Sequence, residues 1–154
     1  METDAILNAT NSRLEHNGGV ARAIVEAGGA TIQADSRIIV ESRGQIAVGD
    51  IAVTKSANRP CRMIIDAVTP TFDPIHPDDN AQQLCSAITR ILEYVKISEQ
   101  IETLTIPANG VGIFGFPVHA CAREIVGIII NKCSPQTFAA SPKSLVMRTG
   151  LLKL

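Results

Sequence analysis

The sequence predicts an α/β layer fold with a mostly parallel sheet. Brief apolar runs alternate with longer stretches whose apolar residues recur every three or four positions, which is the pattern of strands alternating with amphipathic helices. The 154 residues are 45% hydrophobic and 19% charged, so the chain can bury a core of ordinary size. Neither a repeat nor a low-complexity linker divides the chain, and we expect a single domain over residues 1–154.

The first unit is predicted to be a strand, a glycine turn and a helix. Residues 4–9, DAILNA, are a brief apolar run that stops at the polar TNS, which favours a strand. The segment 18–29, GGVARAIVEAGG, has the apolar period of a helix that ends at two glycines. Its inward stripe is expected to contain Val20, Ala23, Ile24 and Ala27. Residues 30–44 are expected to continue as helix, with Ile32, Ile39 and Val40 facing inward.

The middle of the chain is predicted to form two strands, a loop and a helix. Residues 46–56, IAVGDIAVTKS, alternate like an edge strand, whereas 63–68, MIIDAV, form the apolar run typical of a buried strand. Residues 69–77 contain three prolines and are predicted to be loop. A helix capped by Asp78 or Asp79 should follow. Its buried face is expected to comprise Leu84, Ile88, Ile91, Leu92 and Val95.

The last unit is predicted to repeat the order of strand, glycine turn and helix. IETLTIPA, residues 101–108, is the strand, GVGIFG is the turn, and the helix covers roughly residues 119–132. Ligands of such sheets bind at the carboxyl ends of the strands, and both glycine clusters lie at that edge. The unpaired N–H groups at the start of the helix after Gly18 and Gly19 should face the same place.

The GVGIFG segment has the G-x-G-x-x-G spacing of a dinucleotide-binding turn. That fingerprint expects a further strand ending in Asp or Glu roughly 20 residues later. Here Glu124 is the last acidic residue, and Pro117 stands where the next helix would be starting. We therefore favour a cradle of two glycine loops on either side of one diphosphate, held by backbone N–H donors rather than by a lysine clamp.

Composition excludes several other classes of function. Lys and Arg number 14 against 15 Asp and Glu, and aromatic residues are 3%, so we expect no nucleic acid binding. No apolar run is long enough for a membrane span. The four cysteines have no metal-ligand spacing, so we expect reduced thiols, no metal and no cofactor, in the cytoplasm or the nucleus.

Three segments together resemble the macro domain family. NATNSRLEHNGGVARAIVEAGG resembles the first macro-domain signature, N-A-A-N-x-x-L-x-x-G-G-G-V-x-x-A-I, and TLTIPANGVGIFGFP resembles the second, I-A-x-P-A-I-S-S-G-I-F-G-F-P. GDIAVTKSANRPCRMIIDAVTP is similar to the family's connecting block. The ordered match covers roughly residues 3–133, and it is closest to the tandem macro domains of animal multidomain ADP-ribosyltransferase proteins. The resemblance implies a three-layer α/β/α macro-domain-like fold with a mixed, mostly parallel central sheet.

The resemblance also implies a pocket for ADP-ribose, free or as mono- or poly-ADP-ribose on proteins. Asn11 would hydrogen-bond the distal ribose, and Gly18, Gly19, Val20 and Ala21 would line the ribose and the pyrophosphate. The residues implied to wrap the diphosphate from the second loop are Gly110, Val111, Gly112, Ile113 and Phe114. The implied partners are ADP-ribose or ADP-ribosylated proteins, and we expect a monomer or one domain of a larger protein.

The sequence departs from the family pattern at several places. The usual first strand, with a G-D-I segment whose Asp receives the adenine amino group, is absent, so we expect weaker recognition of adenine. The last residues do not resemble the family's final strand and helix, although SLVMR predicts a substitute strand. Asn17 replaces a glycine of the first loop, and Asp66 replaces a His within an apolar strand. A buried carboxylate needs partners or a raised pKa.

Three functions remain open from the sequence. The first is a reader module that binds ADP-ribose, and the second is a weak hydrolase that removes mono-ADP-ribose from acidic side chains. Ala21 stands where one hydrolase branch has an Asp, and Asn11 and His16 are the candidate catalytic residues. The third is a degenerate macro fold that acts as a protein interaction domain.

Overall fold

The computed structural model describes residues 3–56, 61–107, 115–117, 119, 123, 125–128 and 144–147. The first half of this chain contains strand β1 (Ala5–Thr10), helix α1 (Gly19–Gly28), helix α2 (Thr31–Arg43) and strand β2 (Ile51–Lys55). The second half contains strand β3 (Met63–Val68), helix α3 (Pro77–Ile97), strand β4 (Thr103–Ile106) and strand β5 (Ser144–Met147). The alternation of strands and helices that the sequence predicts is therefore confirmed.

The strands form one mixed, mostly parallel sheet in the order β2-β3-β1-β4-β5. Strand β1 lies between β3 and β4 and is parallel to both. The edge strand β2 is antiparallel to β3, and β5 is parallel to β4. The register places Asn8 beside Asp66, so two polar residues meet at the centre of the sheet. The predicted edge strand, buried strand and substitute strand are all present.

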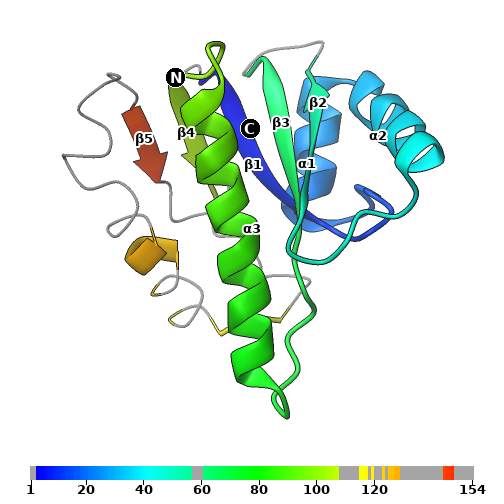
Figure 1. Cartoon of the computed structure of the whole chain (residues 1–154). Coiled ribbons are helices and arrows are strands. Elements are labelled where there is room, and N and C mark those ends of the chain that lie inside the picture. The colour runs from blue at the N-terminus through cyan, green and yellow to red at the C-terminus, as the bar shows by residue number, and fades with distance from the viewer. Residues whose placement is uncertain are drawn as a thin grey trace.

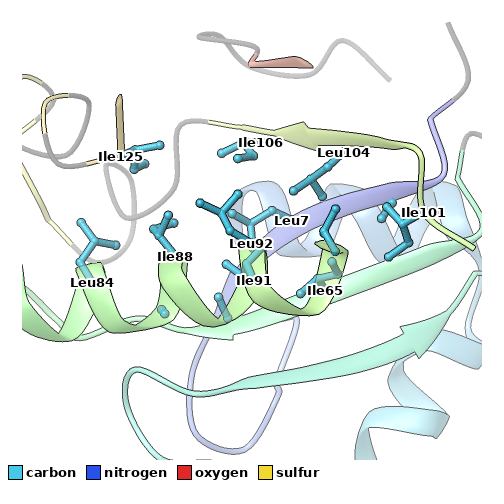
Figure 2. Close-up of a cluster of buried hydrophobic side chains, with 14 of the residues drawn as sticks. Leu7, Ile65, Leu84, Ile88, Ile91, Leu92, Ile101, Leu104, Ile106 and Ile125 are labelled. Atoms are coloured by element: carbon cyan, nitrogen blue, oxygen red, sulfur yellow. The ribbon is translucent and has the colours of Figure 1, made fainter. Parts of the chain in front are cut away.

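Helices cover both faces of the sheet, as expected for three layers (Figure 1). Helix α3 crosses one face, where it packs on alternate residues of β1, β3 and β4 in the largest apolar cluster. Figure 2 shows this cluster, in which Leu84, Ile88, Ile91 and Leu92 of α3 meet Leu7, Ile65, Leu104 and Ile106 of the strands. Helices α1 and α2 lie on the opposite face, over smaller clusters around Ile6, Ile64 and Val68.

Several boundaries differ from the sequence prediction. The expected strand over 46–56 is shorter, because a turn at residues 47–50 precedes it, with Gly49 at φ +85° and the Asp50 N–H on Ala47 O at 3.0 Å. Neither Asp78 nor Asp79 caps α3. The helix begins earlier, at Pro77, whose fixed φ and missing N–H suit a first helical position, and both aspartates lie in the first turn.

The inward face of α1 is also rotated from the predicted stripe. The buried residues are Ala21, Ile24 and Gly28 rather than the set Val20, Ala23, Ile24 and Ala27. Gly28 allows this packing, because a Cβ there would lie 2.4 Å from Ile32 Cδ1. The predicted stripe was placed by the period of the apolar side chains, and a buried glycine has no side chain that would contribute to such a pattern.

Burial of α3 against the sheet should dominate its contribution to stability. We expect Ile91→Ala to lower the free energy of unfolding by about 2–5 kcal/mol, because the side chain is fully buried and its loss leaves a cavity. Ile97→Ala is the matched control on the same helix, because Ile97 is 78% exposed, and its effect should stay within about 0.5 kcal/mol. Urea unfolding of the two variants measures both, and equal losses would contradict this packing.

Candidate functional site

The fold creates a switch point outside the carboxyl ends of β1 and β4. The two strands are parallel neighbours, so the residues that directly follow them, Asn11 and Pro107, lie at the same edge of the sheet. After β1 the chain passes to α1, whose Ile24 packs on one face of the sheet. After β4 it passes to the helical residues 125–128, and Ile125 packs in the cluster on the other face. Ligands of open α/β sheets bind where neighbouring connections diverge in this way.

The first loop, which we define as residues 11–18, is a compact structure held by its own hydrogen bonds. Asn11 Oδ1 accepts hydrogen bonds from the N–H groups of Arg13 at 3.0 Å and Glu15 at 3.1 Å. Asn11 O accepts the N–H of Leu14 at 2.9 Å. Leu14 has a positive φ of 52° and is fully buried, so packing offsets an unfavourable backbone conformation. These bonds give the first turn of the loop a compact conformation.

The Asn11 side chain keeps one donor for a partner outside the loop. Its Nδ2 donates to Glu15 Oε2 at 3.0 Å, and the side chain lies at the surface. A carboxamide nitrogen carries two N–H groups, so the second one is available to an acceptor at the switch point. An exposed Asn11 amide suits the contact with the distal ribose that the resemblance to macro domains implies for this residue.

Two glycines bring the start of α1 to the same edge. Gly18 is the N-cap, with extended backbone, and Gly19 begins the helix with a φ of +56°. Only glycine adopts that left-handed conformation without strain. The N–H of Arg22 makes the first intrahelical bond, to Gly18 O at 3.2 Å, so the preceding N–H groups have no acceptor within the helix. Together with the helix dipole they favour an anion.

A buried pair of ionisable side chains, His16 and Asp66, connects the first loop to β3. His16 Nε2 is 3.0 Å from Asp66 Oδ1, and the two side chains are 1% and 0% exposed. The other ring nitrogen, Nδ1, is 2.9 Å from Gln33 Oε1. Burial alone would lower the pKa of His16, but hydrogen bonds to Asp66 and Gln33 and the charge of Asp66 raise it above its usual range. The ring of His16 therefore points into the protein rather than toward the strand ends.

Strands contribute the remaining partners of Asp66. Asn8 Nδ2 of β1 donates to Asp66 Oδ1 at 2.7 Å, and Thr54 Oγ1 of β2 lies 3.5 Å from Oδ2. Within the described residues, Asn8 Oδ1 has no hydrogen-bond partner. These side chains form a polar layer between two apolar clusters on the α1 and α2 face, one around Ile6 and one around Val68.

The residues of the second glycine loop, Gly110 to Phe114, lie outside the described part of the chain. The segment just after them is anchored in the main core. Phe116 is buried and its ring lies 5.4 Å from that of Phe72, centroid to centroid, at a tilted angle. Gly115 has a φ of +71°, which a residue with a side chain adopts with strain. The end of the loop is thus fixed at the carboxyl end of the sheet.

An open cleft of about 430 Å³ lies between the first loop and α2. Its lining consists of Arg13, Glu15, Asn17, Gln33, Arg37, Val40, Glu41 and Gln45, which include none of the residues predicted to bind ADP-ribose. Charges of both signs line it, so it has no clear preference for an anion. Among the described residues, no three His, Cys, Asp or Glu side chains gather as a metal site would require, and no helix is long and apolar enough to cross a membrane.

The structure describes half of the residues predicted to bind the ligand, and their role in binding stays a prediction. Asn11, Gly18, Gly19, Val20 and Ala21 all follow β1 in the chain, in the first loop and at the start of α1. Ala21 is buried on the inward face of α1, so it can contribute only its main chain. Arg22 points outward and pairs with Glu26, as expected of a solvated helix charge.

Sequence reasoning missed Gln33 as a partner of the loop. Asp66 did give a signal, because a carboxylate within an apolar strand must find donors. Its partner His16 is 50 residues away in sequence and Gln33 is 17 residues from His16, so no local pattern links them.

Comparisons with known proteins agree with this architecture. The family model described as Macro domain matches residues 7–125. An uncharacterized protein of Sulfurisphaera tokodaii is 39% identical over 129 residues, which are 84% of this chain and 68% of that protein. The mouse protein mono-ADP-ribosyltransferase PARP9 is 40% identical over 127 residues, which are 82% of this chain but 15% of that protein.

A solved structure shows the same fold. A mutant Oceanobacillus iheyensis macrodomain with ADPR superposes with a TM-score of 0.83 at 26% identity, and the match covers 98% of this chain and 79% of that one. The family match spans most of the chain and includes most of β1, the first loop, β3 and β4. The chain belongs to the macro domain family.

Proposed function

We propose that the chain binds ADP-ribose, free or attached to proteins as mono- or poly-ADP-ribose, and acts as a reader of this modification. The observation that carries the proposal is the switch point between β1 and β4, together with the N–H groups at the start of α1 that have no acceptor within the helix. A relative with the same fold has been solved with ADPR. ADP-ribose contains a diphosphate between two sugars, and the diphosphate is the group that the N–H donors at this edge of the sheet would bind.

The first loop and the start of α1 supply hydrogen-bond donors to the ligand without using a positively charged side chain. The N–H groups of Gly19, Val20 and Ala21 at the start of α1 bind one side of the diphosphate. Asn11 directs its second Nδ2–H to a hydroxyl of the distal ribose. Such backbone donors explain how a chain with a formal net charge of −1 holds a dianionic ligand.

The second loop completes the cradle in this proposal. Gly110, Val111, Gly112 and Ile113 wrap the diphosphate from the opposite side, and Phe114 packs on the distal sugar. Gly115 and Phe116 support this arrangement, because they fix the following segment next to Phe72 at the carboxyl end of β3 and β4.

The described residues favour binding over hydrolysis. A general base must reach an attacking water with a free acceptor atom. Both ring nitrogens of His16 are occupied by Gln33 and Asp66, and Ala21 has no polar side chain. Glu15 is exposed and receives the Asn11 amide. We therefore assign Asn11 to binding rather than to catalysis, and we place the partners of the chain among ADP-ribosylated proteins of the cytoplasm or nucleus.

The Asn11 amide should be a determinant of affinity, and two variants separate its two roles. Glu15→Gln removes the carboxylate next to Asn11 and should bind ADP-ribose nearly as the parent protein does. Adding Asn11→Asp keeps the oxygen that accepts the Arg13 and Glu15 N–H groups but removes the donor to the ribose. We expect the double variant to bind roughly tenfold more weakly, as for the loss of one hydrogen bond.

Titration calorimetry with ADP-ribose measures this difference, and AMP and NAD are the comparison ligands. Preference for ADP-ribose over AMP would support a site that includes the distal ribose. No heat with ADP-ribose from a folded protein would contradict the proposal and favour a macro fold that acts as a protein interaction domain.

A reader should release no ADP-ribose from its target. We expect incubation with a mono-ADP-ribosylated protein to leave the modification intact, because both ring nitrogens of His16 are occupied and Ala21 has no polar side chain. Mass spectrometry of the target measures the remaining modification. Release of ADP-ribose that disappears in the Asn11→Ala variant would make the chain a hydrolase instead.

Gly19 should be required for its backbone conformation. Gly19→Ala forces a side chain into a φ of +56°, and we expect it to destabilise the fold by about 1–2 kcal/mol and to weaken ADP-ribose binding. Gly127→Ala is the control, because Gly127 is helical and a Cβ there meets nothing within 4 Å among the described residues. That control should be neutral or slightly stabilising. Thermal unfolding and calorimetry compare the two, and unchanged binding by Gly19→Ala would count against the α1 amides as ligands.

A further inference from the structure

The buried pair of His16 and Asp66 is the only titratable contact that joins the described first loop to the centre of the sheet. The loop carries His16, and β3 carries Asp66. Gln33 of α2 bonds the same histidine from the other side. The pair therefore links three separate segments beneath the proposed ligand site.

The hydrogen bonds of Gln33 fix one proton on the ring of His16. Gln33 Nε2 donates to Leu14 O at 3.2 Å, and Gln33 Oε1 accepts the main-chain N–H of His16 at 3.1 Å. The reverse orientation of the amide would set an oxygen against the Leu14 carbonyl and an N–H against the His16 N–H. Gln33 Oε1 therefore faces Nδ1 as an acceptor, and Nδ1 carries a proton.

The surroundings of Asp66 fix the second proton. Asn8 Nδ2 donates to Oδ1 at 2.7 Å and Thr54 Oγ1 reaches Oδ2 at 3.5 Å, so both oxygens serve as acceptors, as those of an ionised carboxylate do. His16 Nε2 lies 3.0 Å from Oδ1, the same oxygen that accepts from Asn8, which suits a second donor to that oxygen. The geometry therefore fits an imidazolium with a donor on each nitrogen.

The geometry points to a positioning role for this ion pair: protonated His16, clamped between Asp66 and Gln33, holds the first loop in the conformation that presents Asn11 and the α1 amides. The inference rests on the proposed function for its effect on affinity. Loss of either ring proton sets a nitrogen lone pair against an acceptor, which is Asp66 Oδ1 at 3.0 Å from Nε2 or Gln33 Oε1 at 2.9 Å from Nδ1. Residues 14–18 then lose one of the two side-chain bonds through which His16 holds them to β3 and α2.

The direction of the pH dependence follows from the raised pKa of His16. A group whose pKa is raised by folding stabilises the fold fully below its unfolded pKa, about 6.5, and loses that contribution as the pH rises through the folded value. Ligand affinity that depends on the loop should fall over the same interval. The diphosphate of ADP-ribose, a diester, does not titrate there.

Few other titratable side chains lie close to His16. The side chains that face it are Asp66 of β3 and Gln33 of α2, and Asn8 of β1 and Thr54 of β2 reach Asp66. Of these four, only Asp66 is titratable. The charged residues that line the cleft beside Gln33 are Arg13, Glu15, Arg37 and Glu41.

Two measurements on the intact chain test the inference. The first follows the ring nitrogens of His16 and the main-chain amides of residues 11–19 by NMR in the ligand-free protein, from about pH 6 to 9. The second follows the dissociation constant of ADP-ribose by calorimetry over the same interval. We expect the chemical shifts of the loop amides to change with the same midpoint as the His16 titration. We expect the dissociation constant of ADP-ribose to rise by roughly fivefold or more at that midpoint, which is a usual size for coupling between two sites.

Matched variants separate positioning from simple stability. In Asp66→Asn the new amide can donate to neutral His16 Nε2, so binding should lose its pH dependence while the fold is kept. His76→Gln is the control, because His76 is an exposed histidine paired with Asp73 and should leave the pH profile unchanged. If Asp66→Asn does not fold, the parent protein still tests the inference. The His16 titration and the loss of ADP-ribose affinity must then have the same midpoint.

The outcomes are distinct from those of the proposed function. Loop amides that ignore the His16 titration, an affinity that stays constant through it, or an Asp66→Asn variant with the parent pH profile would each overturn the positioning role. Absence of ADP-ribose binding at every pH would overturn the proposed function alone, since loop amides that track His16 would still support the clamp.

Discussion

Strand β1 is the element on which the rest of this macro domain depends. It is paired in parallel on both edges, and its two faces contribute to separate apolar clusters. Because β1 lies between β3 and β4, its carboxyl end sets the point from which the first loop departs, next to the carboxyl end of β4. The direction of the chain after β1 and after β4, to opposite faces, then determines where a ligand can lie.

The cost of this arrangement is a charged layer within the sheet. Asp66 is completely buried at the centre of β3, and removing one partner of such a pair typically destabilises a protein by about 3–5 kcal/mol. An apolar residue at the same position would pack without needing any partner. The pair of His16 and Asp66 instead holds the first loop in one position on the sheet. Apolar contacts alone would define that position less strictly, because they are not directional. The layer thereby connects the core with the proposed ligand site.

Much of the fold could be predicted from local patterns. The run MIIDAV became the buried strand β3, and the stripe from Leu84 to Val95 became the buried face of α3, because period and burial are local properties of a sequence. The start of α3 could not be predicted from its acidic residues, since Pro77 determined it. The inward face of α1 was misjudged because its packing depends on Gly28, whose missing side chain lets α1 approach Ile32.

The candidate site was predictable only in part, for a related reason. Gly18 and Gly19 indicate a tight turn into a helix, and in the structure they form the start of α1. The partners of His16 and Asp66 come from distant segments, so their clamp becomes visible only when the chain is folded. Val111 to Phe114 lie outside the described residues, and their place in the cradle stays a prediction.

The central claim is that main-chain amides at the start of α1 bind the diphosphate of ADP-ribose. The most direct measurement is a map of amide chemical-shift changes in the ¹⁵N-labelled protein on addition of ADP-ribose. The account predicts that the largest changes fall on Asn11, on Gly18 to Ala21 and on residues 110–114. Changes confined to the cleft between Arg13 and Arg37, or no changes at all, would contradict it.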